Sequence, residues 1–354
     1  MIKQHFLLID FFSYLQSIMN IGQGVLIILK QIIKNEEHIS SRFYCIFFGK
    51  AIIGLSCLML ISCTKEDENI TAPNETIKIP VIVHIIHNGE EIGEGPNITF
   101  EQVKSQIEVL NEDYRKKEYT NGFNINSVGA DMEIMFFLAE YSPSGNKLAE
   151  AGIDRVNGGR QEWPKGILRN PIETTLKPAT FWDPTKYLNI WTVNFGGFTG
   201  RDLLGYAQFP SNSGLAGLNS DGGLAETDGV VIGYKYFGSS QKGDFDYIFS
   251  PFNLGRTCTH EIGHWLGLRH IWGDGECDVD DYCYDTPNAS EPSYGCLQNK
   301  YSCRSYDMIE NYMDYSDDAC MNTFTIDQKS RITTVLNNSP RRKNLYNNYK
   351  ELVQ

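Results

Sequence analysis

Residues 260–270 read His-Glu-Ile-Gly-His-Trp-Leu-Gly-Leu-Arg-His and fill every fixed position of the pattern HExxHxxGxxH. On a helix, positions i and i+4 differ by only about 40° around the axis, so His260 and His264 project from the same face. Gly267 follows within one turn, where a left-handed residue ends a helix without a Cβ penalty. The chain can then turn back and bring His270 to the same point. The stretch therefore predicts a helix that delivers three imidazoles to one metal ion.

Three neutral imidazoles are a donor set for zinc and leave one position of the metal open. We expect Glu261, next to the first ligand, to face a water bound there. Water acidified by zinc attacks a polarised carbonyl while the carboxylate takes its proton. The motif thus predicts peptide hydrolysis, with zinc as the cofactor and Glu261 as the general base. A lone histidine is more often a hydrogen-bonded core or surface residue, and we interpret His84 and His87 in this way.

The composition of the 354-residue chain excludes one class of partner. Its formal charge of −13 does not provide the basic surface that nucleic acid requires. Hydrophobic residues make up 41% of the chain, which predicts a folded core. Because no internal repeat is visible, we expect one catalytic domain over residues 77–340, followed by a C-terminal tail over residues 341–354. Protein or peptide substrates are the expected partners, and the sequence does not indicate an oligomeric state.

Residues 1–62 are predicted to be a leader. An apolar run over residues 51–62 follows Lys50 and ends in Leu60-Ile61-Ser62-Cys63, which resembles a bacterial lipobox. Cys63 would then carry a lipid, and residues 63–76 read as a flexible tether. Earlier apolar stretches indicate either an overextended start or a segment that stays in the membrane. Both interpretations export the remainder, as an outer-membrane or cell-surface lipoprotein or as a protein released from the cell.

Strands are predicted to precede the zinc-binding helix. Thr99 and Gln102 form a capping-box pattern before an amphipathic run to about Lys116, which predicts a long helix. The region after His270 is rich in Gly, Asp, Asn and Cys and is expected to be loop-rich, with a short helix from Thr325. Four stretches rich in β-branched and aromatic residues read as strands: Ile77–His87, Met132–Ala139, Tyr187–Phe195 and Gly229–Ile232.

Nine cysteines occur in the chain, and those of the catalytic region are even in number. In an exported protein this predicts up to three disulfides, but spacing alone does not select the pairs. Cysteine ligation of zinc is the alternative. The cysteines concerned are Cys258, Cys277, Cys283, Cys296, Cys303 and Cys320.

Asn311-Tyr312-Met313-Asp314-Tyr315, taken together with the zinc motif, resembles the Met-turn of metzincins. The resemblance implies that Met313 lies beneath the metal site. It also implies that Tyr315 swings toward the metal and helps to stabilise the tetrahedral oxyanion, as a preorganised donor does. Without the zinc motif, a methionine between tyrosines is more often a core residue.

Within the metzincins, the segment from about Ile77 to Ile332 resembles the pappalysin family. The resemblance implies an α+β fold in which a mixed twisted sheet, a backing helix and the active-site helix lie above a cleft. An irregular, disulfide-stapled subdomain would lie below it. An extended peptide would pair with the edge strand around Gly205 to Phe209. The matching segments are Ile79–His84, Leu188–Trp191, Leu204–Pro210, Asp228–Ile232, Ile271–Asp274 and Asp285–Pro287.

The family resemblance also implies disulfide pairs and a specificity. It pairs Cys296 with Cys320, and Cys303 with either Cys277 or Cys283, which leaves the other of these two for Cys258. Some relatives prefer a basic residue after the cleaved bond because of an acidic residue just before the last cysteine. Ala319 occupies that position here, and the preceding Asp317 and Asp318 are not assigned its role, so the specificity stays open.

Structural calcium is a further implication, bound in the loop after the zinc motif by hard oxygen ligands. A hydrated acidic loop is the alternative, because the loop lacks EF-hand spacing. The candidate calcium ligands are Asp274, Asp278, Asp280, Asp281 and Asp285.

Two functional hypotheses result from the sequence. The first is a zinc-dependent endopeptidase that acts on extracellular proteins. The second is a surface adhesin or binding lipoprotein in which zinc is only structural. Glu261 argues against the second hypothesis, because a structural zinc site needs no base and usually closes its fourth position.

Overall fold

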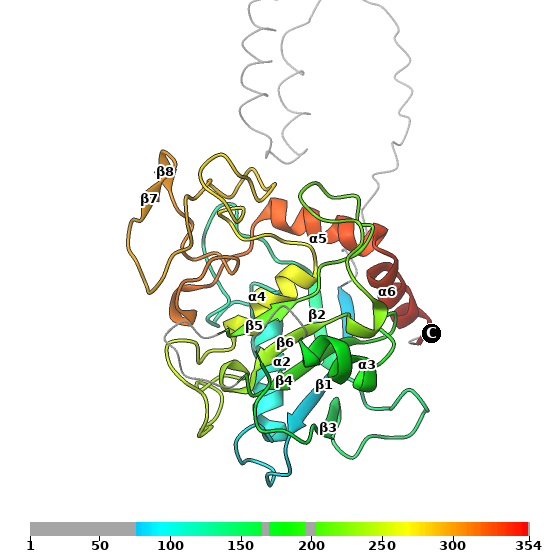
Figure 1. Cartoon of the computed structure of the whole chain (residues 1–354). Coiled ribbons are helices and arrows are strands. Elements are labelled where there is room, and N and C mark those ends of the chain that lie inside the picture. The colour runs from blue at the N-terminus through cyan, green and yellow to red at the C-terminus, as the bar shows by residue number, and fades with distance from the viewer. Residues whose placement is uncertain (1–75, 165–169, 196–202, 353–354) are drawn as a thin grey trace, which may run out of the picture. The chain divides into compact units, whose positions relative to one another are not determined.

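The computed structural model describes residues 76–164, 170–195 and 203–352. Its centre is a six-stranded sheet in the order β2-β1-β4-β6-β5, in which β3 also pairs with β1 (Figure 1). All pairs are parallel except β5 with β6. The sheet is therefore mixed, and its only antiparallel strand lies at an edge. The strands are β1 Ile77–His87, β2 Ile134–Leu138, β3 Ile153–Asn157, β4 Leu188–Val193, β5 Gly205–Ala207 and β6 Val230–Gly233.

The four strands predicted from β-branched and aromatic content are confirmed as β1, β2, β4 and β6. Strand β3 was not predicted, because its sequence Ile-Asp-Arg-Val-Asn is short and half polar. It is held by pairing with the second half of β1, from Val83 to His87, while the first half of β1 pairs with β2. Pairing with the long strand β1, and not local β-propensity, therefore accounts for β3.

Alternating side chains give the sheet two apolar faces. One face carries Val81, Ile190 and Ile232 and packs with the helices α2 and α4 in the larger core. The opposite face carries Trp191 and Val231 and packs in a second cluster with the segment 170–180. In Figure 1, α4 and α3 accordingly lie on different sides of the sheet. Because both faces are covered, the central strands are almost continuously apolar.

The backing helix α2 spans Phe100–Asp113 and the zinc-motif helix α4 spans Arg256–Trp265. Thr99 caps α2 by accepting from the Gln102 backbone N–H at 3.1 Å. The Gln102 side chain does not complete the predicted capping box, because it donates to the carbonyl of Phe237 at 2.8 Å. The short helices elsewhere are η2 Ile172–Leu176, α3 Lys177–Thr180, η3 Ala225–Thr227, η4 Tyr234–Tyr236 and η5 Asp318–Cys320.

The region after the zinc motif is irregular, as predicted, apart from the short hairpin of β7 Tyr301–Ser302 and β8 Ser305–Tyr306. Two disulfides staple it, Cys277–Cys303 and Cys296–Cys320. The third pair is a wrong prediction, since Cys258 and Cys283 are both free and buried. Cys258 belongs to α4 and packs in the larger core, so it has the surroundings of an apolar residue.

Two helices end the described chain, α5 Ile326–Asn338 and α6 Pro340–Leu352. Residues 341–352, expected to be part of a tail, are therefore helical. The guanidinium of Arg342 is fully buried and lies 2.8 Å from the Asp228 carboxylate, while its Nε donates to the Trp265 carbonyl at the end of α4. The segment after residue 340 is consequently part of the core around α4.

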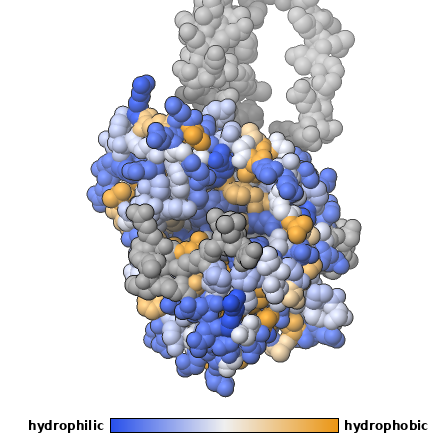
Figure 2. All heavy atoms as spheres, in the orientation of Figure 1, coloured by the Kyte–Doolittle hydropathy of each residue, from blue (hydrophilic) through white to orange (hydrophobic). Residues whose placement is uncertain are grey.

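Figure 2 shows that one face of the molecule is mostly hydrophilic, with hydrophobic residues in small separate patches. This agrees with the position of most large apolar side chains in the two core clusters. None of the helices in the described ranges has the length and apolar character needed to cross a membrane. The leader, Cys63 and the tether up to residue 75 lie outside the described residues.

Candidate active site

Helix α4 carries His260 and His264 on one face, as the i and i+4 spacing predicts, and Glu261 directly after the first of them. It ends at Trp265, and Gly267 has φ +93°, the left-handed conformation expected at this position. The reversal brings His270 back, so that ligand atoms of the three histidines all lie within 4.8 Å of one another. The zinc motif therefore forms one cluster of imidazoles.

Each imidazole is oriented through its Nδ1 atom. That of His260 lies 2.7 Å from the carbonyl of Tyr312, and that of His264 lies 2.8 Å from the carbonyl of Leu268. Nδ1 of His270 hydrogen bonds to the carboxylate of Asp274. Because all three partners are acceptors, each Nδ1 carries the proton and each Nε2 presents a lone pair.

The Nε2 atoms of His264 and His270 face each other at 3.0 Å. Two unprotonated acceptors at this separation repel each other, unless a cation lies within reach of both lone pairs. Burial, with the neighbouring imidazoles, lowers the pKa of His260 well below its usual value and that of His264 to about 3. Neutral, preoriented imidazoles are the zinc donor set, so the residues present fit the metal.

Glu261 is buried beside this cluster, and burial raises the pKa of its carboxyl to about 8. A divalent cation held by the histidines favours the ionised form and opposes this rise. Edge strand β5 comes close to the same side chain: a Cβ on Gly205 would lie 2.9 Å from Cγ of Glu261. Gly205 therefore allows the backbone of β5 to approach the Glu261 side chain closely.

Met313 is fully buried beneath α4. A Cβ on Gly263 would lie 2.5 Å from its sulfur, so only glycine permits this approach. Tyr312, next to Met313, supplies the carbonyl that orients His260. Residues 312–313 therefore determine how closely the zinc-motif helix packs on this segment and how His260 is oriented. The close contact with Met313 also explains why Gly263 stands in mid-helix, where glycine is otherwise unfavourable.

Tyr315 lies next to the histidines and is partly exposed, at 38%. Its ring is edge-on to His270 at 4.9 Å and to Trp272 at 4.7 Å. Burial and the charge of Glu261 raise the pKa of its phenol, so the hydroxyl keeps its proton and can donate a hydrogen bond. The sequence places Tyr315 in the site through the Met-turn resemblance only.

Two supporting residues were missed as such by the sequence analysis. Trp272 stacks on the His270 ring at 4.2 Å with an interplanar angle of 6°, and Asp274 accepts from Nδ1 of His270. Asp274 stands four residues after His270, a spacing that was interpreted only as a calcium ligand. The stacked indole and the carboxylate together restrain the third histidine, which lies beyond the helix.

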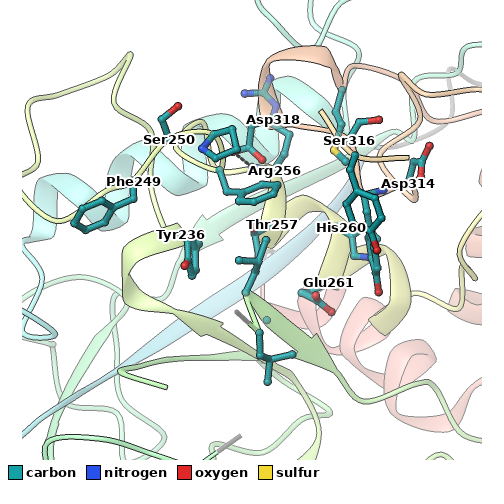
Figure 3. Close-up of a pocket in the computed structure, with 18 residues that line it drawn as sticks. Tyr236, Phe249, Ser250, Arg256, Thr257, His260, Glu261, Asp314, Ser316 and Asp318 are labelled. Atoms are coloured by element: carbon teal, nitrogen blue, oxygen red, sulfur yellow. Dashed lines mark hydrogen bonds between the residues drawn. The ribbon is translucent and has the colours of Figure 1, made fainter. Parts of the chain in front are cut away.

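A cavity of about 700 Å³ opens beside His260 and Glu261. Figure 3 shows Asp318 and Arg256 at one side of it and Glu261 at another. Apolar side chains form much of its wall, and acidic groups are placed among them. The apolar members are Leu203, Leu204, Tyr236, Phe249, Pro251, Phe252 and Met321, the acidic members besides Glu261 are Asp314 and Asp318, and the cationic member is Arg256.

Asp318 gives the cavity a negative group that sequence reasoning did not place there. Its Oδ2 accepts from the backbone N–H of Leu254 at 2.7 Å and of Arg256 at 3.3 Å. Burial raises the pKa of this carboxyl to about 6, so it is ionised above that pH. Ala319 does precede Cys320, as noted from the sequence, but the acidic residue that lines the cavity stands one position earlier.

Two of the candidate calcium ligands contact other residues of the chain. Asp274 binds His270, while Asp285 accepts from Thr325 Oγ1 at 2.6 Å and from the backbone of Asp327 at the start of α5. In the described part of the chain, the three zinc-motif histidines are the only group of three or more potential metal ligands. Asp274 and Asp285 thus have partners within the chain, and calcium binding in this loop stays a prediction.

The fold and this cluster define a class of protein, a zinc metalloendopeptidase with the metzincin arrangement. The family model described as Pregnancy-associated plasma protein-A, of the peptidase M43 family, matches residues 175–337. With the relatives below, this shows that the chain belongs to the pappalysin family.

Two of the relatives are fungal and are named extracellular metalloproteases. The chain is 32% identical to that of Verticillium alfalfae over 272 residues, which are 75% of this chain and 78% of the relative. It is 32% identical to that of Colletotrichum graminicola over 219 residues, which are 60% and 69% of the two chains. These names assign the present chain to exported proteins.

The fold is also similar to a solved bacterial structure, Tannerella forsythia mature mirolysin in complex with a cleaved peptide. The TM-score is 0.65 and the sequence identity 36%, and the match covers 80% of this chain and 100% of mirolysin. The predicted α+β fold and the metalloendopeptidase activity are thereby confirmed, in preference to the adhesin hypothesis.

Proposed function

We propose that the chain cleaves extended peptides with His260, His264 and His270 as zinc ligands and Glu261 as the general base. The observation that carries this proposal is the convergence of three oriented Nε2 atoms beside a buried carboxylate. Zinc, when bound, supplies a Lewis acid that makes water more acidic and polarises a carbonyl. Glu261 takes the proton of the attacking water and passes it to the leaving amine.

Tyr315 is the proposed second catalytic group. Its phenol stays protonated, and its ring contacts the imidazole rings of both His260 and His270. A small rotation of this partly exposed side chain would aim the hydroxyl at the developing oxyanion, where a preorganised donor is most effective. The edge-on contact with Trp272 defines the position from which the ring moves.

The substrate main chain is proposed to pair with β5. This strand lies at the edge of the sheet and uses only one side for pairing with β6. An extended peptide added there would pass over Gly205 and close to Glu261, and main-chain hydrogen bonds would bind it with little regard to sequence. The peptide in the mirolysin complex supports peptide binding in this fold.

The cavity beside Glu261 is proposed to take the side chain after the cleaved bond, with a preference for a basic one. Its apolar wall suits the methylenes of a long side chain, and the Asp318 carboxylate suits a cationic end. Asp318 thus replaces the acid that is missing at Ala319.

The test compares the purified exported protein with its Glu261→Gln variant on a mixed peptide library, with cleavage sites identified by mass spectrometry. We expect chelator-sensitive cleavage by the wild type, and a loss of about 10³-fold or more in the variant with bound zinc unchanged. A Glu101→Gln control on the exposed side of α2 should cleave normally. Retained activity in Glu261→Gln would contradict the assigned base.

Two finer parts of the sequence analysis stay predictions. Lipid attachment at Cys63 predicts that Cys63→Ser moves the protein from the membrane fraction to the medium. Calcium binding by Asp274, Asp278 and Asp285 predicts a rise in melting temperature on adding calcium. The described contacts of Asp274 and Asp285 favour the alternative, a hydrated acidic loop.

A further inference from the structure

Strand β5 is short for the role it has in the proposed function. It spans three residues, Gly205–Ala207, and its only strand partner is β6. A short edge strand with one neighbour is weakly restrained, yet a peptide that pairs with it gains its main-chain hydrogen bonds only if the strand is held in place. Something besides the β6 pairing must therefore hold it next to Glu261.

Tyr206 provides a contact on the other face of the sheet. Because Gly205 faces Glu261, alternation places the Tyr206 side chain on the opposite face, where it packs against the second core cluster. Its hydroxyl donates to Oε1 of Glu173 at 2.6 Å and accepts from Asn170 at 3.4 Å. The middle of the edge strand is thereby tied to the segment that begins η2.

Lys177 binds the same carboxylate. Its Nζ lies 2.6 Å from Oε1 of Glu173 and donates to the carbonyl of Thr227, just before β6, at 3.1 Å. It also lies 5.1 Å from the ring centre of Trp191 in β4 and 5.0 Å from that of Tyr206. One ammonium group thus contacts β4, β5 and the residues just before β6. The Lys177 side chain that carries it is only 1% exposed.

A buried ammonium is an expensive way to stabilise a sheet. Burial lowers the pKa of Lys177 while Glu173 opposes this, so the ion pair has to offset the desolvation of its own charge. Apolar residues of similar volume often stabilise a core as well or better. The ionic cluster adds directional contacts. Hydrogen bonds and an ammonium placed over two aromatic rings fix the position of the strand, whereas apolar burial is not directional.

We propose that Lys177, Glu173 and Tyr206 are positioning residues that hold β5 in place as the template for the substrate main chain. This inference rests on the proposed pairing of substrate with β5. The cluster acts through the strand and touches no substrate, so it affects binding of peptides that lie along β5 more than the chemistry at Glu261.

The test uses Tyr206→Phe and Lys177→Met, with Tyr119→Phe as a control because Tyr119 is almost fully exposed. Each protein is assayed on a long peptide whose main chain spans β5 and on a short peptide limited to the residues around the cleaved bond. We expect KM for the long peptide to rise roughly tenfold in both variants. Values of kcat on both peptides, and KM for the short one, should stay within about twofold of the wild type.

A double variant separates positioning from folding. If Lys177→Met unfolds because it leaves the half-buried carboxylate of Glu173 without its cation, Glu173→Gln in the same chain should restore the melting temperature but not the KM for the long peptide. A lower melting temperature with unchanged KM for the long peptide overturns the inference, and so does an equal loss on both peptides by folded, zinc-loaded variants. Absence of chelator-sensitive cleavage by the wild type would instead contradict the proposed function itself.

Discussion

Asp318→Asn should remove the preference for a basic residue after the cleaved bond. The side chain is only 2% exposed, and its Oδ2 accepts two backbone N–H groups that the oxygen of an asparagine can still bind. The substitution therefore removes the charge and keeps the shape of the cavity. A hydrogen bond to a charged partner contributes about 1.5–3 kcal/mol, and about 1.4 kcal/mol is a factor of ten. The arginine-to-leucine ratio of kcat/KM should fall about 10- to 100-fold.

The assay uses two peptides that differ only in arginine or leucine at this position, so that zinc loading and enzyme concentration cancel in the ratio. Asp317→Asn is the matched control, since Asp317 does not line the cavity. Burial raises the pKa of Asp318 to about 6, so the wild-type ratio should decline as pH falls below that value. In Asp318→Asn the ratio should be flat with pH. A wild-type ratio near one, or a variant ratio within about twofold of wild type, would refute the assignment.

Four further predictions concern the support of the site. Gly263→Ala places a methyl 2.5 Å from the Met313 sulfur and should lower the free energy of unfolding by about 1–3 kcal/mol in chemical denaturation. Trp272→Leu removes the indole stacked on His270, and zinc transfer to a chromogenic chelator should become about tenfold faster. Asp228→Asn leaves Arg342 without its buried counter-charge and should cost about 3 kcal/mol or more, measured as a shift of the denaturation midpoint. Alkylation of the denatured, unreduced protein followed by peptide mapping should label Cys258 and Cys283 and leave the four disulfide cysteines unmodified.

The zinc-binding part of the site could be predicted from sequence because its determinants are local. The spacing of His260 and His264 depends on helical periodicity alone, and the return of His270 depends on one left-handed glycine. The long apolar strands were predictable for the same reason. β3 was not, because its pairing with β1 depends on a partner about 70 residues earlier.

The remaining parts of the site depend on contacts that no local pattern records. Asp318 was named beside Ala319 but given no role, because the sequence does not show that the Leu254 backbone 64 residues away determines where its carboxylate lies. Cys258 was assigned to a disulfide because the cysteine count is even. Its position inside α4, among apolar core residues, keeps it from Cys283, and sequence spacing carries no information about that geometry.

Buried charged side chains contact both ends of the zinc-motif helix. At its start, Arg256 lies 3.0 Å from Asp113 of α2, and Thr259 donates to the same carboxylate at 2.7 Å. At its end, the Arg342 guanidinium lies 3.7 Å above the Trp265 ring. Apolar packing alone would leave a ten-residue helix free to rotate slightly about its axis. Contacts of defined direction at both ends fix that rotation, and the rotation decides whether the imidazoles between them meet at one point.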